Sequence, residues 1–178
     1  MYPSQFAYQR PSSVQEAVAL LSADPDAKVI AGGHSLLPAM KLRLAMPGTL
    51  VDIGRIEGLA GVSLSGDGAR IGAMTTYAQI EDSQELASAF PIIAETVRIV
   101  GDPSVRSRGT LGGSLAHSDP AADFTAVMLA LNASVTAVGP SGEREIAADD
   151  LFVDLLTTSL APDEILTSIT IPALNGAG

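Results

Sequence analysis

The fold is decided by one short stretch, Ile30-Ala31-Gly32-Gly33-His34-Ser35-Leu36-Leu37-Pro38, and a related stretch follows at Thr110-Leu111-Gly112-Gly113-Ser114-Leu115. In both, an apolar run leads into a glycine pair and then into small polar residues. Glycine reaches positive φ angles and has no Cβ, so successive N–H groups can turn toward an anion that a larger residue would hold away. The two stretches therefore predict a site for a diphosphate-bearing cofactor.

The common nucleotide fingerprints are absent from both stretches. The first lacks the Lys-Ser/Thr ending of a P-loop, and neither has the G-x-G-x-x-G spacing of a Rossmann turn. The chain has 17 glycines in 178 residues, and composition alone would give roughly one or two Gly-Gly neighbours. The residues that flank the glycine pairs therefore carry the prediction, and any nucleotide site is of another type.

Composition sets the class of protein and narrows its partners. With 178 residues, 47% of them apolar, the chain can form one domain with a proper core or two small lobes. Only 4% of the residues are aromatic and none is tryptophan, so the core must be aliphatic. The formal charge of −10 opposes binding to nucleic acid or to an anionic membrane surface.

The chain has no cysteine and two histidines, which limits the chemistry it can carry. No disulfide, thiolate nucleophile or cysteine-ligated zinc or iron–sulfur cluster can form within it, and a histidine-rich metal site is not expected. The start at Met1–Phe6 is neither basic nor continuously apolar, and no run approaches the twenty apolar residues of a membrane span. We therefore expect a cytoplasmic protein without a membrane span.

Helices and strands are expected to interleave along the chain. The pattern Ser13-Val14-Gln15-Glu16 predicts a capped helix that ends at Asp24-Pro25. Helical spacing also runs from 76 to 100, broken near Asp82-Ser83 and Pro91, and Ile92, Ile93, Val97 and Val100 are predicted on one face. The other predicted elements are a strand at 28–31, a helix at 35–44, a strand at 49–53, a hairpin of 62–64 and 69–71, a helix at 119–131, a hairpin of 133–138 and 143–146, and a strand at 165–171.

Two boundaries in this pattern are of interest for the site. Asp119 is expected to cap the helix at 119–131, with Pro120 as its first residue. A polar loop with Arg106 and Arg108 leads to the second glycine pair. Glycines cluster between residues 54 and 76, which indicates either a boundary between two lobes or a loop-rich hairpin within one domain.

A family resemblance rests on these same residues. The run from Ala31 to Leu44, followed by Leu50-Val51-Asp52-Ile53 and Ile71-Gly72-Ala73-Met74-Thr75-Thr76, closely resembles the FAD-binding medium subunit of molybdenum hydroxylases, such as carbon monoxide and xanthine dehydrogenases. The later run from Arg106 to Asp123 matches the same family in the same order. The resemblance extends from Tyr8-Gln9-Arg10-Pro11 to the closing strand, which is nearly the whole chain.

The resemblance implies a fold and a cofactor. The fold would be the two-lobed α+β FAD-binding fold of the vanillyl-alcohol oxidase and p-cresol methylhydroxylase type, in a domain of residues 1–178 with possible lobes at 1–54 and 55–178. FAD would lie extended between the lobes, with its pyrophosphate on the backbone of the first glycine stretch and the second stretch as a facing loop. The cofactor-binding residues that the resemblance implies are Ala31, Gly32, Gly33, His34, Ser35, Leu36, Val100, Thr110, Leu111, Gly112, Gly113, Ser114, Asp123 and Leu166.

Within that set, some residues have more specific implied roles. Asp123 matches the family position that contacts the adenosine end through a ribose hydroxyl, while Val100 and Leu166 match apolar positions that pack against the cofactor. From the residues alone, Asp123 is equally well explained as a first-turn acid that favours the helix dipole. With few cations in the chain, we expect oriented N–H groups to bind the pyrophosphate, and therefore modest salt sensitivity.

The resemblance also implies a division of labour between subunits. A molybdopterin-binding large subunit would oxidise the organic substrate, and a small subunit with 2Fe-2S clusters would pass electrons to this FAD and on to a quinone, NAD or oxygen. No catalytic residue and no metal are assigned to this chain. Family members continue beyond Ile171-Pro172 into a further segment and a C-terminal domain, whereas this chain stops at Gly176-Ala177-Gly178. We expect it to bind FAD less firmly than a complete subunit.

Several residues near the glycine stretches have simpler interpretations, which we favour. His34 and His117 are given no proton-transfer role, because a lone loop histidine is more often structural. Arg106 and Arg108 are expected to keep a loop solvated rather than to bind phosphate. The residues Met40, Leu42 and Leu44 are expected to be ordinary core rather than a face for the flavin ring.

Three other functions are weighed against the flavoprotein. Ser35, Asp102 and His117 stand in α/β-hydrolase order, but residue 37 is leucine where a nucleophile elbow needs glycine. The cell-wall reductase that makes UDP-N-acetylmuramate shares the implied fold but needs a substrate domain that this sequence does not show. The third alternative, an assembly or binding module that keeps the fold without a cofactor, remains open.

Overall fold

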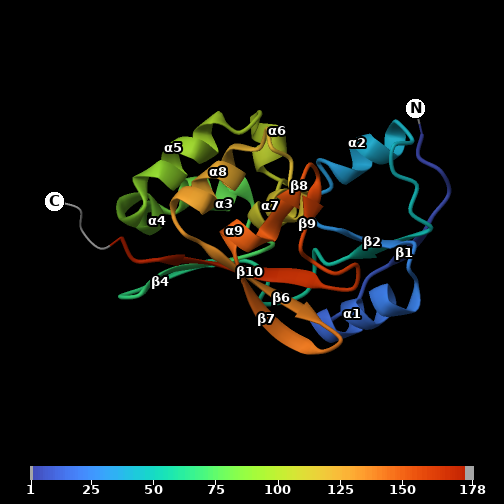
Figure 1. Ribbon diagram of the computed structural model, residues 1–178. Helices are drawn as coiled ribbons and strands as arrows, with labels where there is room; N and C mark the ends of the chain where they lie inside the picture. The colour runs from blue at the N-terminus through green and yellow to red at the C-terminus, as the bar shows by residue number, and fades with distance from the viewer. Residues whose placement is uncertain (1, 175–178) are drawn as a thin grey trace.

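The computed structural model describes residues 2–174 and contains both helices and sheets (Figure 1). Near the N-terminus, a three-stranded parallel sheet has the order β1-β3-β2, with β1 (Ala7–Gln9) and β2 (Ala27–Ile30) on either side of β3 (Thr49–Asp52). Leu50 and Val51 in the central strand are fully buried. All three strands and both helices that connect them precede residue 54.

The second sheet has five antiparallel strands in the order β4-β5-β10-β6-β7. Its central strand β10 pairs with β5 and β6, and its apolar side chains Ile165, Leu166, Ile169 and Ile171 are buried. A separate short pair, β8 and β9, lies beside α7. The strand bounds are β4 (Val62–Ser65), β5 (Gly68–Gly72), β6 (Ser134–Gly139), β7 (Gly142–Ala147), β8 (Phe152–Asp154), β9 (Thr157–Thr158) and β10 (Ile165–Pro172).

Most helices gather on one side of the five-stranded sheet, whereas α1 packs on the other side against β6 (Figure 1). The larger core lies between that helical layer and the sheet, and the smaller core joins α1 to β3 and to Ile165 of β10. The helix bounds are α1 (Val14–Ala23), α2 (Leu36–Lys41), α3 (Tyr77–Asp82), α4 (Gln84–Ala89), α5 (Pro91–Ile99), α6 (Pro103–Arg106), α7 (Leu111–His117), α8 (Asp123–Ala130) and α9 (Ala148–Leu151).

Much of the expected pattern is confirmed. The strands at 28–31, 49–53 and 165–171 and both hairpins are present within a residue or two of their expected ends. The helical run from 76 to 100 consists of α3, α4 and α5, with breaks at Ser83 and before Pro91. Ser13 caps α1 by accepting from the Glu16 N–H, although the Glu16 carboxylate accepts from Ser12 rather than completing the capping box.

Other expectations are wrong in part. The helix at 35–44 ends at Lys41, because Arg43 takes the left-handed conformation at φ +61°. The helix at 119–131 begins at Asp123 with Ala122 as its N-cap, since the Asp119 carboxylate instead accepts from the Ala121 N–H in the preceding turn. Ile92 is 41% exposed and does not share the buried face of Ile93 and Val97.

The strands divide at the glycine-rich region between residues 54 and 76. The three-stranded sheet precedes it, and the hairpin of β4 and β5 lies within it. The two-lobe division stays a prediction, because Ile56 and Leu59 from this region share a core with α1 and with β10.

Over residues 2–174, no helix combines the length and apolar character needed to cross a membrane.

Candidate cofactor-binding site

The two glycine stretches meet at one cleft of about 830 Å³. The lining residues come from the end of β2, the loop after it and α2, and from α7, the start of α8 and the loop between α5 and α6. That volume lies in the range of small-molecule and cofactor sites. Eleven of the residues expected to bind the cofactor line the cleft: Ala31, Gly32, Gly33, His34, Ser35, Leu36, Val100, Thr110, Gly113, Ser114 and Asp123.

The first glycine pair allows two distant backbone segments to touch. A Cβ at Gly32 would overlap the carbonyl oxygen of Arg108, so only glycine permits this approach. Gly33 has φ +78°, a conformation that L side chains rarely adopt. Together they turn the chain sharply between β2 and α2, and they place the loop at residues 31–35 on the cleft wall.

This loop contains backbone donors that have no partner among residues 2–174. Leu37 N–H donates to the Gly33 carbonyl, but across residues 2–174 no group accepts from the N–H groups of His34, Ser35 or Leu36. The Ser35 side chain likewise makes no capping hydrogen bond. Three successive free N–H groups on a cleft wall can bind an anion without any cationic side chain.

The second stretch is a helix turn rather than the loop expected from the sequence. Thr110 caps α7, and the N–H groups at its start already have acceptors: Leu111 donates to the Thr75 carbonyl at 3.1 Å, Gly112 to the Ala73 carbonyl at 3.0 Å, and Gly113 to Thr110 Oγ1 at 3.2 Å. The N–H groups of Leu111, Gly112 and Gly113 are therefore not free to bind a ligand, and this end of α7 can contribute only a surface against which a ligand packs.

Three of the expected site residues do not line the cleft. Leu111 and Leu166 are buried in the larger core, with exposed fractions of 0% and 5%. Gly112 packs against the loop after β5, where an added Cβ would lie 2.5 Å from the Ala73 Cβ. Gly112 thus lets α7 pack closely against the sheet, and this packing holds α7 in place at the cleft.

Charge on the cleft wall is sparse. The lining side chains that can carry charge are Lys28, His34, His117 and Asp123. Asp123 lies in the first turn of α8, so the helix-dipole explanation and a ligand contact are compatible. Lys28 makes no ion pair with any residue that the structure describes, which leaves its ammonium group available to a ligand in the cleft.

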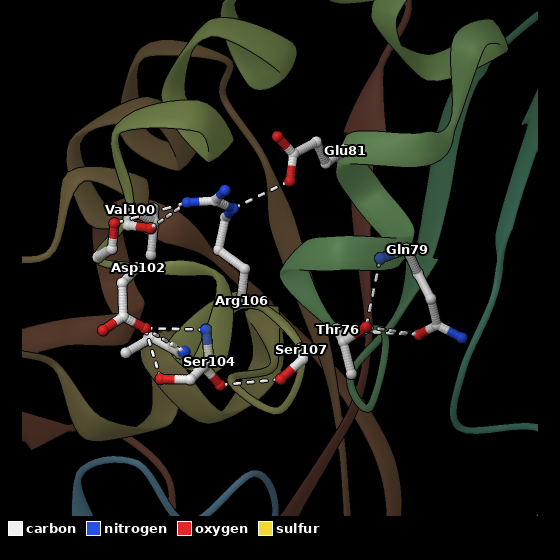
Figure 2. Close-up of polar contacts among 10 residues, drawn as sticks. Thr76, Gln79, Glu81, Val100, Asp102, Ser104, Arg106 and Ser107 are labelled. Atoms are coloured by element: carbon white, nitrogen blue, oxygen red, sulfur yellow. Dashed lines mark hydrogen bonds and ion pairs between the residues drawn. The ribbon is translucent and has the colours of Figure 1, made fainter.

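Arg106 does not line the cleft, and Figure 2 shows its guanidinium between Glu81 and Val100. Its guanidinium donates to Glu81 at 2.9 Å and to the Val100 carbonyl at 3.2 Å. Arg108 contributes its backbone carbonyl against Gly32 and does not line the cleft. Arg106 therefore ties α6 to α3 and to the end of α5, and its side chain, only 17% exposed, does not keep the loop solvated as expected.

The hydrolase constellation is not assembled. Asp102 is the N-cap of α6 and accepts from the Ser104 and Val105 N–H groups at 2.8 and 3.0 Å (Figure 2). The Ser104 hydroxyl is the main cause of the lowered pKa of Asp102, with these two N–H groups adding to it. The carboxylate is thus engaged in capping, and it does not orient His117 for catalysis.

Sequence reasoning missed an aromatic pair in the wall. Tyr77 and Phe124 both line the cleft and are stacked, with ring centroids 5.3 Å apart and planes 14° apart. Burial raises the pKa of Tyr77, and a hydrogen bond with Ser114 acts in the opposite direction. The phenol therefore stays neutral near the Ser114 and Asp123 side chains. Tyr77 lies between Thr76 and Gln79, which form a capping box; this pattern predicts the start of a helix but not a binding site.

The helix expected to be ordinary core is only partly so. Met40 is 1% exposed, but Leu42 is 61% and Leu44 80% exposed, and Leu44 lines the cleft. Because α2 ends at Lys41, the residues that follow turn outward. The core interpretation is correct for Met40 and wrong for the two leucines.

Comparison with known proteins places this geometry in context. The family model described as the FAD binding domain in molybdopterin dehydrogenase matches residues 4–174. The nicotine 6-hydroxylase medium subunit of Paenarthrobacter nicotinovorans is 48% identical over 172 residues, which is 96% of this chain and 61% of that protein. The carbon monoxide dehydrogenase medium chain of Hydrogenophaga pseudoflava is 44% identical over 97% of this chain and 61% of its own length.

A solved structure of Hydrogenophaga pseudoflava carbon monoxide dehydrogenase, in a form that lacks the Mo-pyranopterin moiety, superposes with a TM-score of 0.96. It is 44% identical and covers 100% of this chain, whereas this chain covers 62% of it. The chain thus spans about three fifths of the length of these relatives. The match includes both glycine stretches and the whole cleft between them.

Proposed function

The chain belongs to the family of FAD-binding domains of molybdopterin dehydrogenases, and on that premise we propose that it binds FAD in the cleft. The observation that carries the proposal is the row of free N–H groups at His34, Ser35 and Leu36. These three residues follow the left-handed Gly33 and line the cleft. A diphosphate is the part of FAD that such a row fits.

The other cleft residues fit the remaining parts of the cofactor. The exposed Asp123 carboxylate can accept from a ribose hydroxyl, and Val100 offers an apolar contact. Lys28 can face the diphosphate. Gly113 and Ser114 line the cleft without a large side chain, so the cofactor can approach the backbone of α7 there. We propose the arrangement as the two-lobed fold of the vanillyl-alcohol oxidase type, with FAD extended across the cleft.

We propose that the chain serves as the flavoprotein part of a molybdenum-containing dehydrogenase, an oxidoreductase. When bound, FAD supplies reversible redox chemistry that can pass electrons from 2Fe-2S clusters of a small subunit to an external acceptor. The residues of this chain bind the cofactor, orient it and limit its access to water. Substrate oxidation belongs to a molybdopterin-binding large subunit, and a cytoplasmic location suits this assembly.

The test compares two glycines with nearly the same backbone conformation. Gly33 has φ +78° and lines the cleft, while Gly58 has φ +81° and lies outside it, with open space around its missing Cβ. Alanine at either position strains the backbone by about 1 kcal/mol. We expect Gly33→Ala to weaken FAD binding about tenfold, because it turns the free N–H groups away. Gly58→Ala should bind FAD as the unsubstituted chain does.

The measurement is the visible flavin absorption retained after incubation with FAD and desalting, followed by a fluorescence titration. If the two variants bound FAD with equal affinity, the glycine loop would not be part of the FAD site. No binding by the unsubstituted chain, alone and with partner subunits, would instead favour the alternative of a cofactor-free assembly module.

A further inference from the structure

The short hairpin of β8 and β9 carries an unusual turn. Asp154 pairs with Thr157, so the turn consists of Leu155 and Leu156. Leu156 adopts φ +53°. Glycine or asparagine is typical where such a tight turn needs a positive φ, because a side chain there meets the backbone. Both leucines are also exposed, at 66% and 53%, so the core does not explain them.

The backbone around Leu156 is fixed by hydrogen bonds to the end of α7. Leu156 N–H donates to the Ser118 carbonyl at 3.1 Å, and the Ser118 hydroxyl donates to the Thr157 carbonyl at 3.3 Å. Ser118 is 5% exposed and is itself left-handed, with φ +53°. Two strained residues that are not glycine therefore hold each other in place, which presents the Leu156 side chain in a fixed position.

That position is the wall of the cleft. Leu156 lines it together with His117 from the end of α7, whereas its neighbour Leu155 does not line it. Strained backbone of this kind is retained where the surrounding structure enforces it, and it concentrates at ligand sites. The Leu156 side chain is large, apolar and 53% exposed at the cleft wall, so residues 2–174 cover it only in part and a ligand in the cleft would supply further packing.

We propose that Leu156 is a cofactor-contacting residue, whose side chain packs on an aromatic ring of the dinucleotide. The inference rests on the proposed binding of FAD in this cleft. Ser118 acts as a positioning residue, because it fixes the turn without lining the cleft. The ring is either the flavin or the adenine, since both present flat apolar faces.

The experiment uses Leu156→Ala and Leu155→Ala as a matched pair in the 178-residue chain. Both remove the same side chain from the same turn, but only Leu156 lines the cleft. We expect Leu156→Ala to raise the Kd for FAD about fivefold, from the lost apolar contact, and Leu155→Ala to leave it unchanged. Titration with ADP separates the two rings, because a loss for FAD alone assigns the flavin and an equal loss for ADP assigns the adenine.

A third variant separates contact from stability. Leu156→Gly relieves the strained φ, so the midpoint of thermal unfolding without FAD should rise by about 2 °C while FAD affinity falls as in Leu156→Ala. At a residue with only a structural role, the same substitution would not both raise the midpoint of thermal unfolding and lower FAD affinity. Unchanged FAD affinity in Leu156→Ala, with the unsubstituted chain binding FAD, would overturn this inference alone. Failure of the unsubstituted chain to bind FAD, alone and with partner subunits, would overturn both this inference and the proposed function.

Discussion

At the residue scale, the two glycine pairs serve different purposes that their sequences do not distinguish. Gly33 is required by its own positive φ, which local sequence can suggest because a polar turn follows an apolar strand. Gly112 is required by Ala73, a residue 39 positions earlier that only the folded chain brings close. The sequence therefore identified the first pair for the right reason and the second by its pattern alone.

Tyr77 is a residue whose role the structure reveals and a single substitution can test. Tyr77→Phe keeps the stack on Phe124 and removes only the hydroxyl that meets Ser114. Because Ser114 then loses a partner at the cleft wall, we expect the Kd for FAD to rise about threefold. A fluorescence titration of flavin measures it.

The control for that prediction is Tyr8→Phe. Tyr8 also places its hydroxyl on a polar partner, Asp52, but it lies outside the cleft. Its removal should leave FAD affinity unchanged. If Tyr77→Phe behaved in the same way, the hydroxyl would have no part in holding the cofactor wall.

At the scale of elements, turn chemistry predicted more than helix propensity did. Both hairpins were predictable because Gly66 and Gly68 mark one turn and Gly139 and Gly142 mark the other. The helix α7 was missed, because a glycine pair lowers the helix propensity of its first turn. Packing against β10 and the sheet overrides that local preference, as the close approach of Gly112 shows.

The ion pair between Arg144 and Glu164 links β7 to the segment before β10. The guanidinium donates to both carboxylate oxygens, at 2.7 and 2.8 Å, and also to the Ser159 carbonyl. This hydrogen bonding by Arg144 is the main cause that lowers the pKa of Glu164. Since the pKa of the folded state lies below that of the unfolded chain, the stabilisation is present at neutral pH and is lost as pH falls through the lowered pKa of Glu164.

We therefore expect Arg144→Met to lower the free energy of unfolding at pH 7 only modestly, because the Arg144 side chain is 46% exposed and an exposed ion pair is screened by water. Below about pH 3 the variant and the unsubstituted chain should be equally stable. Urea unfolding at both pH values measures this. Arg70→Met serves as a control, because Arg70 makes no ion pair within residues 2–174. A deficit that is equal at both pH values would assign the effect to lost packing instead.

At the scale of the whole molecule, the site is a place where segments far apart in the chain converge. The loop after β2, the start of α7 and the turn between β8 and β9 all line one cleft, although residues 31 and 156 are 125 positions apart in the chain. The resemblance to a family predicted the first two segments. It did not include the third, because a pair of leucines in a short hairpin carries no local signal for a ligand.

The charge of the whole molecule opposes the ligand that the cleft would bind. The formal charge is −10, and the diphosphate of FAD is also negative, so long-range repulsion is expected at low salt. The short-range attraction comes from N–H groups and from Lys28. Salt screens both the long-range repulsion and the attraction by Lys28, since the Debye length falls from about 14 Å at 50 mM to about 4 Å at 500 mM, whereas it has little effect on the short-range hydrogen bonds of the N–H groups.

The two effects should nearly cancel in the salt dependence of binding. Between 50 and 500 mM NaCl we expect the Kd for FAD to change less than about threefold, because a single cationic side chain competes with salt while screening relieves the repulsion. Lys28→Gln should weaken binding at low salt, and its affinity should then rise as salt is added, since only the repulsion remains to be screened. Isothermal titration at both salt concentrations measures these changes. A tenfold loss of affinity for the unsubstituted chain at high salt would mean that ion pairs, rather than the N–H groups of the glycine loop, bind the diphosphate.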